Sequence, residues 1–255
     1  MLFSISRIRI RIRAAAFFAA LSLVAAAAFA VPGADELLVL LDKAQTFESS
    51  YANATMTIVD RFGTRRTEFK VWSRGKDDTF MEFTSAAERG QKILRNAKEL
   101  YLFFPDAEEV TRLQGSALRQ GMAGSDISYE DMTGNRNRAQ NYTAVILGTE
   151  QLEGRSVFHL DLKAKSRTVA YARQEAWIDA ADYLPSLIKF YDLSGKLLKE
   201  MTFSGRLVVD GYPFNTRFLV RDMLKAGTST EMAFRDLTVN QSLPKNIFSL
   251  DNLKW

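Results

Sequence analysis

The chain has 255 residues, of which 47% are hydrophobic, with five prolines and no cysteine. This composition is typical of a globular protein and excludes a disordered chain, a collagen and a disulfide-stabilised miniprotein. The formal net charge is +4, but Arg7, Arg9, Arg11 and Arg13 all precede the first acidic residue, Asp35. The chain beyond residue 30 is therefore neutral, with 30 basic and 30 acidic residues. It lacks the cationic excess that nucleic-acid binding needs.

Residues 1–30 have the three parts of a secretory signal peptide. The four arginines are followed by an alanine-rich apolar stretch at 14–28 and by Ala28-Phe29-Ala30, which suits signal peptidase. An uncleaved anchor is the alternative, because the stretch approaches the roughly 20 apolar residues that span a bilayer. No paired arginines precede it, so we expect the general secretion route, and no cysteine can accept a lipid. The sequence predicts a cleaved signal peptide at 1–30 and one soluble periplasmic domain at 31–255.

The pattern of apolar residues predicts one helix followed by many strands. Residues 35–45 are expected to be helical, with a stripe of apolar residues that includes Leu37, Leu38 and Leu41. After it the alternation has period two and predicts strands at 52–58, 67–73, 79–85, 91–95, 100–104, 109–113, 142–150, 155–165, 173–179, 185–192, 196–209, 214–224 and 228–238. Most of the connections are short, which favours an antiparallel meander over a parallel sheet, whose crossovers need a dozen or more residues.

A central helical insert at 114–140, rich in Gly, Arg and Asn, interrupts the alternation. Two short helices are expected within it, at 116–122 and 125–132, the second capped by Ser125 with Asp126 in its first turn. So many strands in one sheet must curl to bury one face. The expected fold is mainly β (α+β): a strongly curved antiparallel sheet, covered on its concave side by the N-terminal helix and the insert.

Two segments carry a resemblance to a known family. They are Gly124-Ser125-Asp126-Ile127-Ser128-Tyr129-Glu130-Asp131-Met132, which follows a strand pair ending near Leu113, and the closing Leu243-Pro244-Lys245-Asn246-Ile247-Phe248. The chain resembles the periplasmic outer-membrane lipoprotein-sorting (LolA-like) family, in its divergent lipoprotein-sorting-like branch. The resemblance covers nearly all of the chain after the signal peptide. It implies an unclosed β-barrel lidded by helices around an apolar cavity that holds acyl chains. No arginine here aligns with the family's gating arginine, so no gating residue is assigned.

The sequence offers little catalytic chemistry. The single histidine, His159, lies on a predicted strand and is expected on its solvent side. One histidine without cysteine excludes the usual zinc ligand sets and a Cys-His pair. No GxSxG, P-loop or GxGxxG motif occurs. We therefore expect no catalytic residue, no metal and no cofactor, and a protein that is not an enzyme.

Charged residues gather around the insert. Asp126, Glu130 and Asp131 could bind a cation or act as a carboxylate pair, but a role at a helix N-terminus is favoured. Four basic residues near the insert could bind a lipid phosphate or an acidic partner, but a simpler role as solvent-exposed charges in loops is favoured. These are Arg112, Arg119, Arg136 and Arg138.

Apolar side chains at alternating strand positions are the candidates for ligand binding. A cavity on the concave side is expected to be lined by Phe69, Val71, Met81, Phe83, Leu102, Phe104, Ile188, Phe190, Met201, Phe203, Phe218, Met232 and Phe234. Met122, Ile127, Tyr129 and Met132 are expected to form a lid over it. Methionine, soft and unbranched, suits an adaptable lining. An ordinary packed core is the alternative for each residue. The cavity interpretation rests on a sheet with more concave surface than its helices can fill.

Two functions fit these expectations. The first is a periplasmic carrier that binds the acyl chains of a lipoprotein or lipid for transfer towards the outer membrane, with an inner-membrane transporter as a further partner. Burying a sixteen-carbon chain contributes on the order of 12 kcal/mol, at about 0.8 kcal/mol per methylene. Opening of the lid must offset part of this binding free energy, so that the carrier can release the acyl chain. The second is a non-enzymatic accessory or sensory module of a membrane export pump or signalling complex. A secreted hydrolase is a third, less favoured function.

Overall fold

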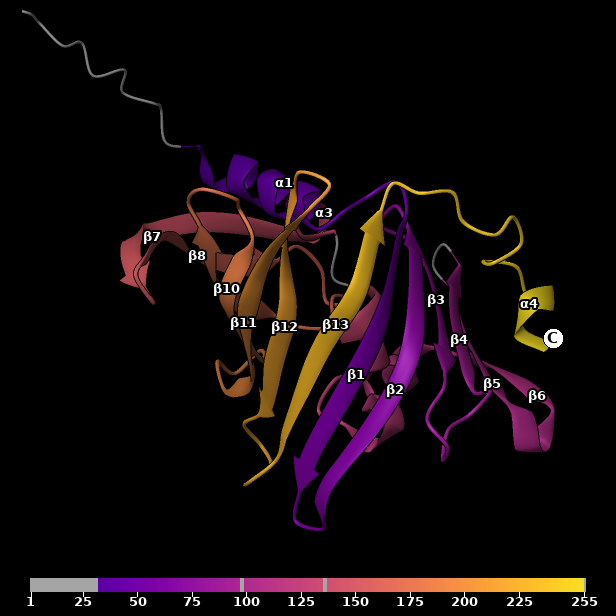
Figure 1. Ribbon diagram of the computed structural model, residues 1–255. Coiled ribbons are helices and arrows are strands. Elements are labelled where there is room, and N and C mark those ends of the chain that lie inside the picture. The colour runs from indigo at the N-terminus through magenta and orange to yellow at the C-terminus, as the bar shows by residue number, and fades with distance from the viewer. Residues whose placement is uncertain (1–31, 97–98, 135–136, 255) are drawn as a thin grey trace, which may run out of the picture. The chain divides into compact units, whose positions relative to one another are not determined.

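One antiparallel sheet of thirteen strands makes up most of the structure, a computed structural model that describes residues 32–254 except 97–98 and 135–136 (Figure 1). The expected signal peptide at 1–30 lies outside these residues. Pro32–Trp255 form one compact unit, which contains the whole sheet. In the described part of the chain, no helix combines the length and the apolar character needed to cross a bilayer.

The thirteen strands lie within a few residues of the segments predicted from period two. They are β1 Ser50–Asp60, β2 Gly63–Arg74, β3 Asp78–Phe83, β4 Lys92–Asn96, β5 Glu99–Phe104, β6 Glu109–Leu113, β7 Tyr142–Leu152, β8 Arg155–Ala164, β9 Arg173–Asp179, β10 Pro185–Tyr191, β11 Leu197–Val209, β12 Tyr212–Asp222 and β13 Ser229–Val239. The α-helices are α1 Ala34–Ala44, α2 Tyr129–Gly134, α3 Arg138–Asn141 and α4 Asp251–Lys254. The 3-10 helices are η1 Pro105–Ala107, η2 Gly115–Arg119 and η3 Met122–Gly124.

The sheet consists of two meanders joined by the pairing of β1 with β13. Its strand order is β6-β5-β4-β3-β2-β1-β13-β12-β11-β10-β9-β8-β7. In the central pair Ser50 lies opposite Val239, and Val59 lies opposite Ser229. This pairing leaves β6 and β7, which are consecutive in the chain, at the two opposite edges. The sheet is therefore an unclosed barrel, as predicted. The segment between β6 and β7, residues 114–141, connects its two edges and is one residue longer than the predicted insert; we call it the insert from here on.

The inner face of the sheet carries the main core. α1 contributes Leu37, Leu38 and Leu41 to it, all fully buried, and the insert contributes Met122 and Ile127. A period of 3.6 residues places the apolar side chains of α1 on one face of the helix, and a period of two places those of the strands on one face of the sheet. These two apolar faces pack against each other in the main core. The prediction that α1 and the insert cover this face is confirmed.

A second apolar cluster lies on the outer face and was not predicted. Ile247, Phe248 and Leu253 of the C-terminal segment are buried against Phe80 and Leu94 of β3 and β4. Two hydrogen bonds fasten the segment: the Asn96 side chain donates to the Phe248 carbonyl at 3.0 Å, and Lys92 Nζ donates to the Asn252 carbonyl at 3.0 Å. The C-terminal segment therefore shields outward-pointing side chains that alternation alone assigns to solvent.

The helices of the insert differ from those predicted. The predicted helix at 116–122 is partly the 3-10 helix η2, and the second helix begins at Tyr129 rather than at residue 125. The Asp126 amide donates to Thr230 Oγ1 of β13 at 3.0 Å, and the Ile127 amide donates to Ser125 Oγ at 3.1 Å. These side-chain acceptors compete with a helical ladder. The prediction that a helix at 125–132 is capped by Ser125 was therefore wrong.

Ser128 is the residue that caps α2. Its backbone amide donates to the Asp131 carboxylate at 3.0 Å, and the Asp131 amide donates to Ser128 Oγ at 3.0 Å. This reciprocal pair is a capping box, which satisfies two amides at the helix start. Of the three acids of the insert, Glu130 and Asp131 thus lie in the first turn of a helix, as predicted, whereas Asp126 lies outside the helix.

Candidate functional site

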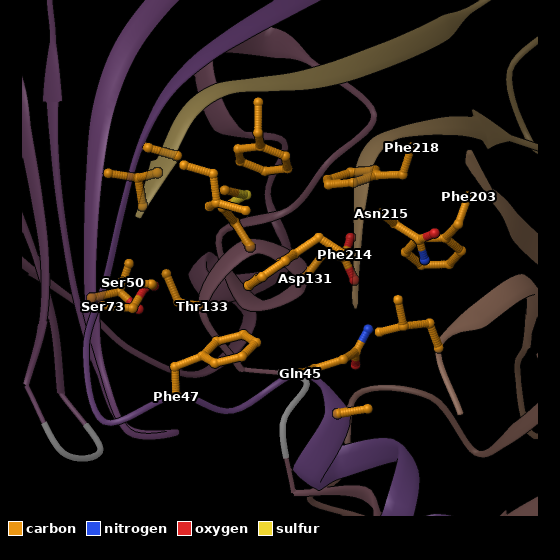
Figure 2. Close-up of a pocket in the computed structure, with 18 of the residues that line it drawn as sticks. Gln45, Phe47, Ser50, Ser73, Asp131, Thr133, Phe203, Phe214, Asn215 and Phe218 are labelled. Carbon is orange, nitrogen blue, oxygen red and sulfur yellow. The ribbon is translucent and has the colours of Figure 1, made fainter. Parts of the chain in front are cut away.

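The main candidate site is a cavity of about 220 Å³ against the inner face of the sheet (Figure 2). We call it the first cavity. The insert contributes Ile127 and Met132, and the segment after α1 contributes Gln45 and Phe47. Five of the thirteen lining residues expected from the sequence border it: Val71, Met201, Phe203, Phe218 and Phe234. The rings of Phe203, Phe218 and Phe234 form a row on adjacent strands, with successive centroids 5.9 and 6.0 Å apart.

A second cavity, of about 230 Å³, lies under β3 to β5. Among its lining residues are Phe83, Leu102 and Phe104, which the sequence also assigned to the lining, and Met122 and Tyr129 of the expected lid. The four lid residues are thus divided, two at each cavity, and the insert borders both. Sequence reasoning expected one cavity, whereas in the described part of the chain the expected lining and lid residues are divided between these two cavities.

The other five expected lining residues border neither of these two cavities. All are buried in the main core, at positions where neighbouring side chains already fill the space. They are Phe69, Met81, Ile188, Phe190 and Met232. For these five residues, packing in the core accounts for their apolar side chains at alternating strand positions, without contact to a ligand.

A buried ion pair anchors α2 beside the first cavity. Lys199 Nζ of β11 contacts the carboxylate of Asp131, whose side chain is 1% exposed, and Tyr171 donates its hydroxyl to the same carboxylate at 2.8 Å. Burial and the neighbouring Asp131 charge raise the pKa of Tyr171, so this hydroxyl stays a donor. The pair joins the insert to the sheet, because its partners come from α2 and β11.

Arg138 is buried, contrary to the prediction of a solvated loop charge. Its side chain is 5% exposed, lines the first cavity and donates to Gln45 Oε1 at 3.0 Å. Asp42 of α1 lies 3.7 Å from the guanidinium and accepts the Ala139 amide at 3.0 Å. Burial lowers the pKa of Arg138, and Asp42 opposes the shift. The reason for the burial is tertiary: α3 packs against the end of α1.

The other basic residues near the insert lie as predicted or outside the described residues. Arg112 is half exposed and pairs with Glu99 at 2.6 Å, and Arg119 is half exposed, 3.9 Å from Glu130. Burial raises the pKa of Glu130, while Arg119 opposes the shift. Arg136 lies outside the described residues.

Asp126 and His159 have structural partners. Asp126, 6% exposed, accepts the Thr228 hydroxyl at 3.1 Å and lies 3.6 Å from Lys225 Nζ, so it fastens the insert to the start of β13. His159 lies on the outer face, as predicted, stacked on Trp177 at 4.0 Å between ring centroids. Across the described residues, no three carboxylate or imidazole side chains gather in metal-binding geometry.

Phe47 joins the segment between α1 and β1 to β12 beside the first cavity. Its ring stacks on Phe214, with centroids 4.7 Å apart (Figure 2). It also meets the Tyr212 ring edge-on at 5.5 Å. Sequence reasoning missed Gln45, Phe47 and Asn215 as lining residues, because they lie in a connecting segment or at a polar position of a strand. No periodic signal marks such residues.

The fold is shared with several solved structures. A DUF1329 family protein from Desulfovibrio piger matches at a TM-score of 0.80 and 24% identity, over 86% of this chain and 97% of that one. A putative outer membrane lipoprotein-sorting protein domain from Vibrio parahaemolyticus matches at 0.77 and 23%, over 86% and 98%. A LolA superfamily protein from Nitrosomonas europaea matches at 0.72 and 24%, over 87% and 99%. At these identities the likeness establishes the fold.

Comparison of sequences adds one match. A family model with the description "Uncharacterized protein" covers residues 75–255, from the end of β2 to the C-terminus. No curated protein matches the chain.

Proposed function

The chain belongs to the family whose model covers residues 75–255, a divergent branch with the LolA-like fold, and on that premise we propose that it is a periplasmic carrier. It binds the acyl chains of a lipoprotein or lipid in its apolar cavity and delivers them towards the outer membrane. The observation that carries the proposal is the first cavity, where the aromatic row of β11 to β13 faces the insert. Such a lining, mostly apolar with a few polar side chains such as Gln45 and Asn215, contacts hydrocarbon mainly through shape and apolar surface.

Loading requires the insert to move. Each cavity is smaller than the roughly 300–1,000 Å³ of sites that hold drug-sized ligands. Ile127 and Met132 border the first cavity and Met122 and Tyr129 the second, so displacement of the insert enlarges both and joins them. We therefore propose that the closed insert and the acyl chain occupy the same space in turn.

Binding of a fluorescent fatty acid to the purified unit Pro32–Trp255 tests the carrier function. We expect saturable binding that unlabelled palmitate displaces, because the lining is mostly apolar. Native mass spectrometry of protein purified from its own cells should also show bound lipid. A protein that binds no probe and carries no lipid would contradict the carrier function.

Replacing Phe47 with alanine is expected to speed release of the probe several-fold. The substitution removes the stacking on Phe214 and the edge contact with Tyr212, each about 0.5–1.5 kcal/mol. Stopped-flow displacement by excess palmitate measures the release rate. Trp177→Ala, which removes a stacked ring on the outer face and borders neither of the two cavities, is the control and should leave the rate unchanged. Equal acceleration by both variants would contradict a specific role for Phe47.

We also propose that the protein is exported by the general secretion route and processed after Ala30. N-terminal sequencing of the protein from the periplasmic fraction should therefore begin at Val31. Recovery of the intact segment 1–30 in membranes would instead identify an anchor.

A non-enzymatic accessory or sensory module of a membrane complex is the second candidate. It is favoured by the small volume of the first cavity, about 220 Å³, because a filled interior suits a protein that signals through its surface. This second function would be supported if the purified protein carries no lipid and binds no probe, and if it captures a membrane protein.

A further inference from the structure

Three hairpin turns carry strongly exposed apolar side chains. Phe62, in the turn from β1 to β2, is 81% exposed, and Leu193, in the turn from β10 to β11, is 83% exposed. Met223 and Leu224, in the turn from β12 to β13, are about half exposed. Apolar residues at turn tips contribute nothing to the core, so they need another explanation.

Strand pairing brings these three turns to one end of the sheet. Val59, at the end of β1, lies opposite Ser229, at the start of β13, and Lys199 of β11 lies opposite Asp222 of β12. Figure 1 shows the turns from β1 to β2 and from β12 to β13 at the lower end of the view, and α1 at the upper end. Four strand spacings separate the middles of the two outer turns, roughly 19 Å along the sheet.

Each tip also carries a basic residue. The Arg61 guanidinium lies 4.6 Å from the centroid of the Phe62 ring, and it has no ion pair within 4 Å among the described residues. Lys196 follows Leu193 in its turn and is exposed, and Lys225 follows Leu224. Cations placed beside apolar tips are the combination that an anionic lipid surface attracts.

The acidic residues of the three turns accept hydrogen bonds from amides of their own turns, and Asp126 of the insert lies 3.6 Å from Lys225 Nζ. Asp60 accepts the Phe62 amide at 2.8 Å, and Asp192 accepts the Lys196 amide at 2.9 Å. Asp222 accepts the Leu224 amide at 2.9 Å and pairs with Lys225 at 3.0 Å. The carboxylates therefore shape the turns.

We propose that this end of the sheet docks on a bilayer containing anionic phospholipid, with the three apolar tips inserted into the headgroup boundary. Convex tips on separate hairpins do not form a groove for a partner helix or strand, whereas a lipid surface accepts each tip independently. The inference goes beyond the carrier function and does not depend on an occupied cavity. It assigns the membrane contact to the end opposite α1.

Co-sedimentation with protein-free vesicles tests the docking, using the unit Pro32–Trp255, which contains the whole sheet and both apolar clusters. We expect binding to vesicles with about one third phosphatidylglycerol and weak binding to pure phosphatidylcholine. Arg61→Ser should weaken binding about fivefold, the equivalent of the roughly 1 kcal/mol that one cation contributes near an anionic surface. The triple variant Phe62→Ser, Leu193→Ser, Leu224→Ser should weaken it at least about tenfold.

The matched control is Leu207→Ser with Val208→Ser, at the end of β11 next to the turn to β12 and at the opposite end of the sheet, where both residues are also exposed. This pair should bind vesicles as wild type does. All variants lie in exposed turns or turn-flanking positions, and circular dichroism with thermal unfolding verifies their folding. The proposal is overturned if wild type ignores anionic vesicles, if the control loses as much binding as the triple variant, or if only native membranes with their proteins bind.

Discussion

Replacing Ile127 with alanine is expected to lower the free energy of unfolding by about 2–5 kcal/mol, the cost of truncating a fully buried aliphatic side chain. Affinity for the fluorescent fatty acid should hold or rise. Ile127 borders the first cavity, and its fully buried side chain packs the insert into the main core in the closed state. A weaker closed state competes less with the acyl chain, which raises the fraction of protein that can bind. Urea unfolding and a probe titration measure the two quantities.

Ile188→Ala is the matched control for this prediction. Ile188 is equally buried, in β10, but borders neither of the two cavities. It should lose similar stability without a gain in affinity. The lid interpretation fails if Ile127→Ala loses affinity in step with its stability, or if both variants change affinity alike.

Replacing Asp131 with alanine is expected to destabilise the protein by about 3–5 kcal/mol, because it leaves the Lys199 ammonium buried without its counter-ion. The change also removes the acceptor for the Tyr171 hydroxyl and one half of the capping box of α2. Thermal unfolding followed by circular dichroism measures the loss. The insert should detach first, since Asp131 joins α2 to the sheet, and hydrogen exchange at 114–141 would record this.

The double variant Asp131→Ala with Lys199→Met distinguishes an unpaired charge from lost packing. Methionine fills a similar volume without a charge, so the double variant should recover a large part of the stability. If it is no more stable than the single variant, the ion pair is not the source of the loss.

The sheet was predictable strand by strand because its signal is local. Ala52, Ala54, Met56 and Ile58 alternate within seven residues, and all four are buried on the inner face. Alternation of this kind records which side of each strand faces the core. The stripe of α1 is equally local. Strand positions and the faces they bury therefore followed from neighbours in the chain.

The candidate site was only partly predictable. Alternation marks a side chain as inward-pointing, but Phe218 borders a cavity whereas Phe190 is packed in the core, and both satisfy the same pattern. The difference depends on what lies opposite each residue. Arg138 shows the converse, since nothing near it in the sequence indicates the α1 terminus that buries it.

The sequence by itself thus determined the strands, α1, the antiparallel connections and the inner face, because period and turn chemistry act over a few residues. Only the tertiary structure decided the pairing of β1 with β13, which places β6 and β7 at opposite edges, and the start of α2 at Tyr129, after its cap Ser128. It also decided the packing of the C-terminal segment on the outer face and the division of the interior into two cavities. The physical reason is that these contacts join residues up to nearly two hundred positions apart in the chain. Several arrangements satisfy the local sequence equally well, and the fit of side chains and the hydrogen bonds between distant segments select one of them.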